Sequence, residues 1–484
     1  MNFNNKYFFN KIVKKLFFTA LWLFLASLTM AQEPKKNMIV ISDSLKNGKF
    51  VQHFRCGFDT AQINYTLQKY LERYANSGYP FAKTFCDSIV VNQQTGRFYF
   101  SVKKGNYYKI ENIFLPGKPK ITPYYIYRTI HLKPGAEFSH RKLTRANALI
   151  NNTGILKTTQ QAQPEFHPND ADIYLYIQKQ KCNSAEAGIA LMYNPQKERY
   201  YPTGNATLML ANNLGKGETF GFEWHGYKEN SQKLSAEIRL PYLFGTAISA
   251  EGNTKINKTD STCVFVAINP AIEVGLSDVI SVKADVSSTW LIPQNEQSTI
   301  EKSNSTLYGA DILWLCTFHN SILKASVGAA TGKRNNNGEK YNCQELRMSL
   351  LYNRTLWQRF EISSITSSKV KLCDAETYIY EKYRFGGAST LRGFNEEYFF
   401  ADRYILLSNT LRYRPYDNFS IFTFYDLATY QCNSANDTPQ GMGIGAGLRQ
   451  NNADIDIAWA IGREHNEYLP LKQAKIHITV KLFF

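Results

Sequence analysis

An arginine between a glycine pair and an aromatic residue is the side chain of this sequence best suited to fixed charge recognition. Residues Gly386–Phe394 read GGASTLRGF, with Arg392 next to Gly393. Two adjacent glycines let a backbone turn sharply or approach another segment closely. A loop folded back into a cavity would present this guanidinium to a carboxylate through paired hydrogen bonds. The motif therefore predicts a charge-recognition site, with an ordinary exposed loop arginine as the alternative.

The remaining sequence contains no catalytic or metal-binding motif. The eight histidines show no HExxH or paired metal-ligand spacing, and no GxSxG nucleophile motif occurs. The glycine-rich run Gly441–Gly447 (GMGIGAG) lies in a strand pattern with no following helix, so it is not a nucleotide-binding loop. Glycines in such a strand mark a bend or a close backbone approach. We therefore predict that the protein is not an enzyme and uses no metal or cofactor.

The elements that must position Arg392 are long alternating strands, which begin near Ala185 and continue to the C-terminus. One of them places Phe220, Phe222 and Trp224 on one face and polar residues on the other. A soluble sandwich also alternates, but many successive long segments with a polar inner face are more typical of a transmembrane barrel. We predict a transmembrane antiparallel β-barrel over residues 185–484 with about sixteen strands, of which roughly eleven precede the arginine motif and five follow it.

Residues 32–181 mix helical and strand patterns within short segments, which predicts small α+β modules. Residues 105–181 read as a strand, two helices and a hairpin, which is enough for one such domain. Residues 32–104 contain an amphipathic helix, Thr60–Asn76, followed by two strands, and read as an incomplete or divergent copy. Modules of this kind expose sheet edges, which can accept an added strand from an extended chain.

The first thirty-one residues have the features of a secretory signal peptide. Four lysines precede the apolar run Leu16–Leu28, and Thr29–Ala31 supplies residues suited to cleavage. The mature chain is predicted to begin at Gln32. An uncleaved membrane anchor is the alternative, which the short apolar run disfavours.

The charge distribution and the cysteine spacing exclude a nucleic-acid partner and a CxxC metal or redox site. The formal net charge is +16, but the charges are dispersed singly along the strands without a basic stripe, so we predict no nucleic-acid partner. The eight cysteines form no CxxC pair. Cys56 and Cys86 could pair in an oxidising periplasm, whereas most of the others fall in strand patterns and suit small packing residues.

Four features, in their order along the chain, resemble the BamA/TamA superfamily of outer-membrane assembly factors, also called the bacterial surface antigen family. They are the run Gly204–Glu218 (GNATLMLANNLGKGE), the run Ala236–Gly245 (AEIRLPYLFG), the motif GGASTLRGF, and the terminal aromatic Phe484. By the same resemblance, the modules at 32–104 and 105–181 look like POTRA domains. The chain looks like a short, reduced or accessory member, because central assembly factors usually carry more POTRA repeats.

The resemblance implies that the loop packs inside the barrel as a latch, with Asp426 as the partner of Arg392. Many members also carry a glutamate on the strand after the loop, but Ser408–Arg414 (SNTLRYR) has no carboxylate, which leaves Glu396 or Glu397 as a substitute. Phe484 is implied to be a signal by which the barrel is itself inserted. The implied latch residues are Gly386, Gly387, Leu391, Arg392, Gly393 and Phe394.

The resemblance further implies an outer-membrane location, with the N-terminal modules in the periplasm. The expected partners are membrane lipid, unfolded outer-membrane protein clients, and periplasmic or lipoprotein accessory subunits. The expected function is to fold and insert those clients, whose strands would pair at a weak seam between residues 185–194 and 475–484. Two alternatives stay open: a polypeptide translocation pore of the same superfamily with the Arg392 loop as a movable plug, and a passive barrel.

Overall fold

The computed structural model describes most of the chain from residue 37 onward, so the predicted signal peptide, residues 1–31, lies outside the described residues. Contacts divide the chain into two compact units. One comprises the described residues up to 110 together with 137–141 and 166–171, and the other comprises the described residues of 111–136, 142–165 and 172–484. The described residues are 37–484 without 46–47, 57–59, 93–94, 195–198, 229–230, 260–261, 278, 295–300, 319–320, 358 and 465–473.

The first unit contains a four-stranded sheet in the order β2-β1-β4-β3 and one helix, α2. Ile63, Leu67 and Tyr70 recur at helical spacing and pack with Phe98 and Phe100 of β4 in one buried cluster. The predicted helix and the two strands after it are therefore present, whereas β1 and β2 were not predicted. The elements are β1 (Asn37–Leu45), β2 (Gly48–Cys56), α2 (Thr60–Ala75), β3 (Lys83–Asn92) and β4 (Thr95–Lys103).

Residues 105–181 form two helices and two small sheets, close to the predicted pattern. Ile126 and Ile130 of α3 and Ala146 and Ile150 of α4 are each fully buried, four residues apart on one helix face. The strand order of the larger sheet is β5-β8-β7, and β6 pairs with β9. The elements are β5 (Lys109–Phe114), α3 (Pro123–Ile130), α4 (His140–Asn152), β6 (Leu156–Thr158), β7 (Gln163–Phe166), β8 (Asp170–Tyr174) and β9 (Ile177–Lys179).

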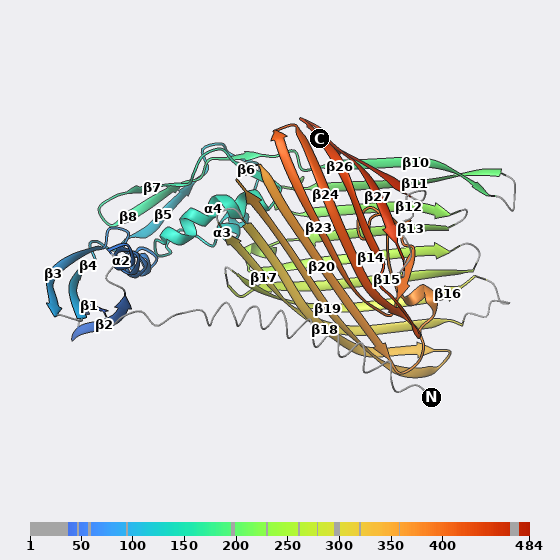
Figure 1. Ribbon diagram of the computed structural model, residues 1–484, viewed down its shortest axis with the longest axis horizontal. Coiled ribbons are helices and arrows are strands. Elements are labelled where there is room, and N and C mark those ends of the chain that lie inside the picture. Colours follow the sequence, from blue (N-terminus) through green and yellow to red (C-terminus); the bar gives the residue numbers. More distant parts are fainter. Residues whose placement is uncertain are drawn as a thin grey trace. The chain divides into compact units, whose positions relative to one another are not determined.

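The rest of the chain is a closed antiparallel barrel of 16 strands, in which each strand pairs with the next and β28 pairs with β10 (Figure 1). The predicted fold class and strand count are confirmed: β10–β20 precede the arginine loop, and β23, β24, β26, β27 and β28 follow it. The barrel strands are β10 (Ser184–Asn194), β11 (Arg199–Ala211), β12 (Thr219–Lys228), β13 (Ser231–Leu240), β14 (Ile248–Thr259), β15 (Cys263–Gly275), β16 (Ile280–Pro293), β17 (Ser303–Phe318), β18 (Ser321–Asn336), β19 (Glu339–Leu356), β20 (Phe360–Cys373), β23 (Arg403–Tyr416), β24 (Phe419–Cys432), β26 (Gln440–Gln450), β27 (Ala453–Arg463) and β28 (Lys475–Phe483). Shorter elements are the turns η1 (Leu243–Gly245) and η2 (Ile379–Glu381) and the strands β21 (Tyr383–Phe385), β22 (Phe399–Ala401) and β25 (Ala435–Asp437).

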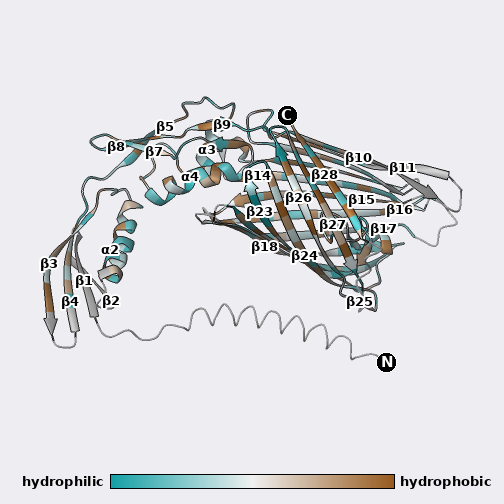
Figure 2. Ribbon diagram, turned by 45° about the horizontal axis from the view of Figure 1, so that its top comes forward, coloured by the Kyte–Doolittle hydropathy of each residue, from teal (hydrophilic) through white to brown (hydrophobic). Residues whose placement is uncertain are grey.

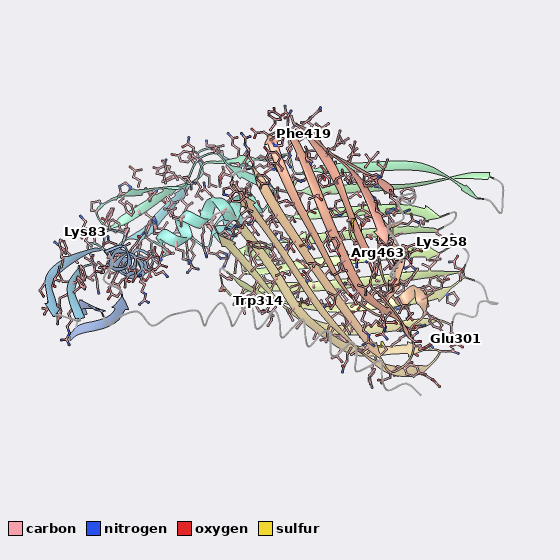
Figure 3. All side chains as sticks on the ribbon, in the orientation of Figure 1. Lys83, Lys258, Glu301, Trp314, Phe419 and Arg463 are labelled. Atoms are coloured by element: carbon pink, nitrogen blue, oxygen red, sulfur yellow. A yellow bond between two sulfur atoms is a disulfide. The ribbon has the colours of Figure 1, made fainter. Side chains whose placement is uncertain are left out.

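The barrel strands alternate between an apolar and a polar face, and Figure 2 shows both kinds of residue along individual strands. On β28, Ile476 and Ile478 are 68% and 65% exposed, which places them on the outer surface. Apolar side chains on the outside of a closed barrel suit contact with hydrocarbon. Figure 3 shows Trp314 toward one end of the barrel and Lys258 and Glu301 toward the other. Among the helices that the structure describes, none is both long and apolar enough to cross a membrane.

Candidate functional site

The segment between β20 and β23, residues 374–402, contacts side chains of β13, β18 and β24, which lie far apart around the barrel, and so crosses the lumen. We call it the plug loop, and Gly386–Phe394 its tip. The short strands β21 and β22 pair as the stem of a hairpin that carries the tip. Gly386 and Gly387 have φ angles of 125° and 97°, a region in which a side chain would be strained. The Gly386 amide donates to the Thr390 hydroxyl at 2.8 Å. The glycine pair therefore makes the sharp turn that the sequence predicts.

Arg392 meets Asp426 through the paired hydrogen bonds that a guanidinium and a carboxylate favour. Its Nη2 donates to Oδ1 at 2.6 Å and its Nε donates to Oδ2 at 2.7 Å. The backbone amide of Arg392 adds a third bond to Oδ2 at 3.0 Å. The Asp426 side chain is fully buried and that of Arg392 is 15% exposed. The structure thus brings together the two residues that the resemblance pairs, and screening by water is weak at this site.

Hydroxyl groups, and not a second carboxylate, complete the surroundings of Arg392. Its Nη2 donates to Ser408 at 3.1 Å and to Thr410 at 3.2 Å, both on β23. Ser408 in turn donates to Asp426 at 2.6 Å. Ser408 lies directly opposite Asp426 in the strand pairing, which explains the short contact. On β23, neutral hydroxyl groups and not a carboxylate therefore complete the contacts of Arg392.

Glu396 and Glu397 do not take that place. Glu396 accepts the Ala388 amide at 2.7 Å, within the plug loop itself. Glu397 pairs with Lys233 of β13 at 2.8 Å and with Arg384 at 3.6 Å. Burial raises the pKa of Glu396. Burial also acts to raise the pKa of Glu397, but the nearby lysine charges outweigh it and hold that pKa below its ordinary value.

The apolar residues of the tip anchor it against the barrel wall. Leu391 is fully buried and Phe394 is 7% exposed, in one cluster with Phe385 and Phe399 of the hairpin stem and Ala428 of β24. Burying side chains of this size stabilises the docked loop by about 1.5–3 kcal/mol each. Leu391 and Phe394, the two apolar residues of the predicted latch, therefore pack the tip against the barrel wall.

Glycines on β26 make room for the tip. A Cβ on Gly441 would lie 1.9 Å from the carbonyl oxygen of Arg392, and one on Gly443 would lie 2.6 Å from the Phe424 ring. The guanidinium of Arg392 also lies over the Phe424 ring, 3.8 Å from its centre. The GMGIGAG run is thus a strand whose missing side chains allow close backbone approach, as predicted.

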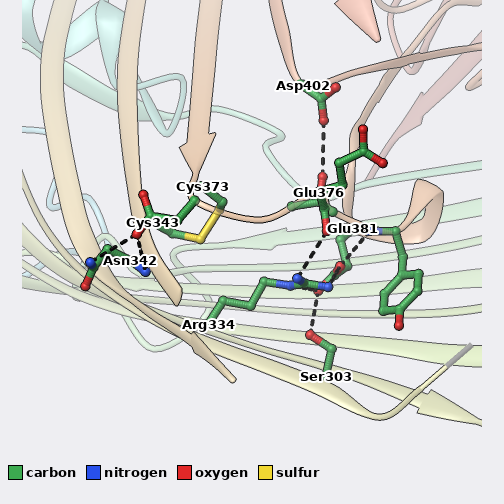
Figure 4. The surroundings of a disulfide bond; sticks show 11 residues. Ser303, Arg334, Asn342, Cys343, Cys373, Glu376, Glu381 and Asp402 are labelled. Atoms are coloured by element: carbon green, nitrogen blue, oxygen red, sulfur yellow. Dashed lines mark hydrogen bonds and ion pairs between the residues drawn. A yellow bond between two sulfur atoms is a disulfide. The ribbon is translucent and has the colours of Figure 1, made fainter. Parts of the chain in front are cut away.

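A second set of bonds fixes the other end of the plug loop, and sequence reasoning missed it. Arg334 of β18, with a side chain that is 0% exposed, donates to both carboxylate oxygens of Glu381, at 3.1 and 2.8 Å (Figure 4). Ser303 donates to the same carboxylate at 3.0 Å. Lys382 adds an ion pair with Asp402 at 2.7 Å. No local motif marks these residues, because they come from three distant parts of the chain.

A disulfide joins β19 and β20 beside this anchor. Cys343 and Cys373 lie directly opposite each other in the strand pairing and are bonded (Figure 4). Cys86 is a free thiol, so the considered bridge to Cys56 does not form. Spacing along the chain could not identify the real pair, because it depends on the strand register. The bridge lies where the plug loop leaves the barrel wall, so it fixes the loop's starting point.

The barrel closes through a short seam. Among the described residues, β10 pairs with β28 at Ser184–Phe483 and Ala185–Leu482, whereas it pairs with β11 along its whole length. The amide of Phe484 donates to the Asn183 carbonyl at 3.0 Å, and the Phe484 side chain is 56% exposed. The role of Phe484 as an insertion signal stays a prediction.

These features can perform reversible closure by ion pairs and packing. Among the described residues, no group of histidine, cysteine and acidic side chains could hold a metal ion. The tip touches strands on both sides of Asp426, and the Gly393 amide donates to His477 of β28 at 3.2 Å. A loop held by a few side chains across a lumen can be displaced as a unit when those contacts break.

Comparison with known proteins gives one family match and several solved structures with the same fold. A family model described as "Haemolysin secretion/activation protein ShlB/FhaC/HecB" matches residues 276–450, which include the plug loop and Asp426. CdiB from Escherichia coli has a TM-score of 0.60 at 12% identity, covering 94% of this chain and 93% of that one. CdiB from Acinetobacter baumannii has a TM-score of 0.59 at 13% identity, covering 94% and 91%.

At these identities the likeness establishes the fold alone. A BamA structure from Haemophilus ducreyi that lacks POTRA domains 1–3 has a TM-score of 0.41 at 14% identity, covering 89% of this chain and 95% of that one, which is too low to carry an argument. No curated protein matches the sequence. The family model that does match is one of secretion proteins, so it does not support the expected assignment to BamA/TamA assembly factors in particular.

Proposed function

We propose that the chain forms a polypeptide translocation pore in the bacterial outer membrane, with the plug loop as its movable closure. This is the alternative function considered from the sequence, and it replaces client folding as the main interpretation. The match to a family of haemolysin secretion proteins supports it. The outer-membrane location follows from the barrel with its apolar exterior.

The observation that carries the proposal is the way in which the plug loop is attached inside the barrel, separately at its tip and at its base. Its tip is attached by one ion pair, a few hydroxyl contacts and a small apolar cluster. Its base is fixed separately by the Arg334–Glu381 pair and the neighbouring disulfide. A loop with a fixed base and a separately bonded tip can swing open without leaving the barrel. A passive barrel would not require the tip and the base of the loop to be attached separately.

We further propose that residues 32–104 and 105–181 are POTRA-like modules in the periplasm, where they receive the unfolded polypeptide. Their sheets support this role, because an extended chain can add a strand to an exposed edge. The strand β2 lies at one edge of the sheet in the first unit, and β7 lies at one edge of the three-stranded sheet. The pairing would use backbone hydrogen bonds and so tolerate many client sequences.

Depletion of the protein in its host, followed by proteomics of the outer membrane and of the medium, tests the proposal. We expect one or a few secreted polypeptides to disappear from the medium while other barrel proteins keep their normal levels. A general loss of barrel proteins, with secretion unchanged, would overturn the proposal. Complementation by the wild-type chain is the control, and complementation by Arg392→Ala reports whether the closed state is needed.

A second function, insertion of other barrels, is favoured by one observation. The seam between β10 and β28 is paired at two positions, which leaves other backbone groups of these strands open to a client strand. A disulfide between cysteines placed at Ala185 and Leu482 would close this seam. If insertion is the function, the oxidised variant loses it and regains it on reduction. If translocation through the lumen is the function, secretion continues with the seam closed.

A further inference from the structure

The barrel lumen contains a cavity of about 730 Å³ whose wall carries more positive than negative charge. We call it the lumen cavity. Eight basic and five acidic side chains line it, from the barrel wall and from the plug loop. A cavity lined by one excess sign of charge and enclosed by protein concentrates the opposite charge. The pairing of each basic group decides how much of this charge is free.

Several of the cationic groups are already neutralised. Arg347 pairs with Asp285 at 2.6 Å and with Asp311 at 3.3 Å. Arg239 pairs with Glu251 at 3.1 Å. These pairs are part of the wall, so they contribute little to the attraction of a further anion.

Three lysines of the lumen cavity have no such partner. Within the described part of the chain, Lys255, Lys369 and Lys371 form no ion pair with a carboxylate, although all three line the cavity. The Lys369 ammonium lies over the Tyr383 ring, 5.5 Å from its centre. Lysine charges without partners, half-buried in a narrow lumen, favour the arrival of carboxylates.

The plug loop already places one carboxylate beside this charge. Glu397 bridges Lys233 of the wall and Arg384 of the loop, at 2.8 and 3.6 Å. Its second oxygen, Oε2, is buried without a hydrogen bond. When the loop moves, Glu397 moves with it, and the Lys233 charge loses its partner.

The spacing of the free lysines favours an extended chain as the ligand. Lys369 and Lys371 lie two residues apart on β20, so they point to the same face, about 6.8 Å apart along the strand. Acidic residues two apart in an extended polypeptide have the same spacing. Lys255 comes from β14 and contributes a third contact from another part of the wall.

We propose that the lumen cavity binds acidic segments of the polypeptide that passes through the barrel, through Lys255, Lys369 and Lys371. The inference rests on the proposed translocation function, because it names the chemistry of the segment that enters. Binding exchanges the Glu397 carboxylate of the closed loop for carboxylates of the client. The bound segment thereby keeps the lumen charge compensated while the plug loop is displaced.

The test measures binding of a fluorescently labelled peptide to the purified full-length chain in detergent. The probe is a ten-residue peptide of alternating Glu and Ser, and alternating Gln/Ser and Lys/Ser peptides are the controls. We expect the Glu/Ser peptide to bind at least tenfold more tightly than either control, and raised salt to weaken its binding. The Arg392→Ala variant, with a loosened plug, should bind it more tightly than the wild type.

The triple variant Lys255→Gln, Lys369→Gln and Lys371→Gln should raise the dissociation constant of the Glu/Ser peptide at least tenfold. Lys258→Gln is the matched control, because it changes a lysine of β14 outside the lumen cavity and should leave binding unchanged. Heat-modifiable gel mobility verifies that each variant is folded.

Two results would overturn the proposal: equal binding of the Glu/Ser and Gln/Ser peptides, or unchanged binding by the folded triple variant. A misfolded triple variant is replaced by the three single Lys→Gln variants, of which at least one must weaken binding. The depletion experiment detects a failure of the translocation function separately. If the chain does not translocate polypeptides, secretion continues after depletion, whether or not the purified chain binds the peptide.

Discussion

Replacing Arg392 with alanine should release the tip of the plug loop. The change removes both side-chain hydrogen bonds to Asp426 and leaves a fully buried carboxylate with the Ser408 hydroxyl and one backbone amide. Removing one member of a buried ion pair costs about 3–5 kcal/mol. Arg392 is 15% exposed, so water can partly replace it, and we expect a value at the lower end, about 3 kcal/mol.

Hydrogen exchange of the peptide spanning residues 386–394 measures this change directly. The Arg392 and Gly393 amides are bonded to Asp426 and His477 and can exchange only when the tip leaves them. If exchange follows local opening, a loss of about 3 kcal/mol speeds it about a hundredfold. Amides of β18 and β19, far from the tip in the strand order, should keep their rates.

Arg449→Ala is the matched control for this experiment. It also removes an arginine from a pair with an aspartate, Asp454, but the Arg449 side chain is 57% exposed. Exposed pairs contribute about 0–1 kcal/mol, so the tip should exchange as in the wild type. Asp426→Asn should also release the tip. Wild-type exchange in both Arg392→Ala and Asp426→Asn would refute the assignment of this pair as the attachment of the loop.

Three further perturbations follow from the same geometry. Gly441→Ala inserts a Cβ where the Arg392 carbonyl lies and should raise tip exchange at least tenfold, whereas Gly275→Ala, in open strand surroundings, should not; equal effects would contradict the close approach. Reduction of Cys343–Cys373 should lower the stability of the barrel wall by about 3 kcal/mol, seen as a lower unfolding temperature on heat-modifiable gels, and an unchanged temperature would count against it. The pKa of Glu397 is lowered in the docked loop. Its ion pair with Lys233 therefore stabilises docking fully at pH values above the ordinary pKa of 4.5, and this stabilisation is lost as the pH falls through the lowered pKa. Tip exchange, corrected for its intrinsic pH dependence, should therefore rise below pH 4.5 in the wild type but not in Glu397→Gln, and parallel profiles would refute it.

The barrel could be predicted from the sequence because its signal repeats locally. Each strand alternates with period two, so residues such as Ile476 and Ile478 reveal their face without knowledge of the neighbouring strand. The glycine pair and Arg392 could be predicted for the same reason, since both lie within nine residues. The pairing with Asp426 needed the resemblance to known proteins, because two residues on different strands have no local signature.

The anchors that were missed depend on which strands meet across the lumen. Arg334 and Glu381 are 47 residues apart, and nothing in their local sequences distinguishes them from surface charges. The Cys343–Cys373 bridge likewise depends on the register of β19 against β20, which a one-residue slip would destroy. The hydroxyl groups of Ser408 and Thr410 could not be predicted as partners of Arg392, because the resemblance implies a carboxylate on that strand.

The hydrogen bond from the Gly393 amide to His477 joins the plug loop to a strand of the barrel seam. His477 belongs to β28, which pairs with β10 at two positions. The same strand therefore contacts the plug loop in the lumen and forms one side of the barrel seam. Withdrawal of the tip removes a support from β28, and fraying of β28 removes a support from the tip. If the plug loop and the seam both open, as proposed above, the two openings are therefore energetically linked, and a ligand that favours one also lowers the free-energy cost of the other.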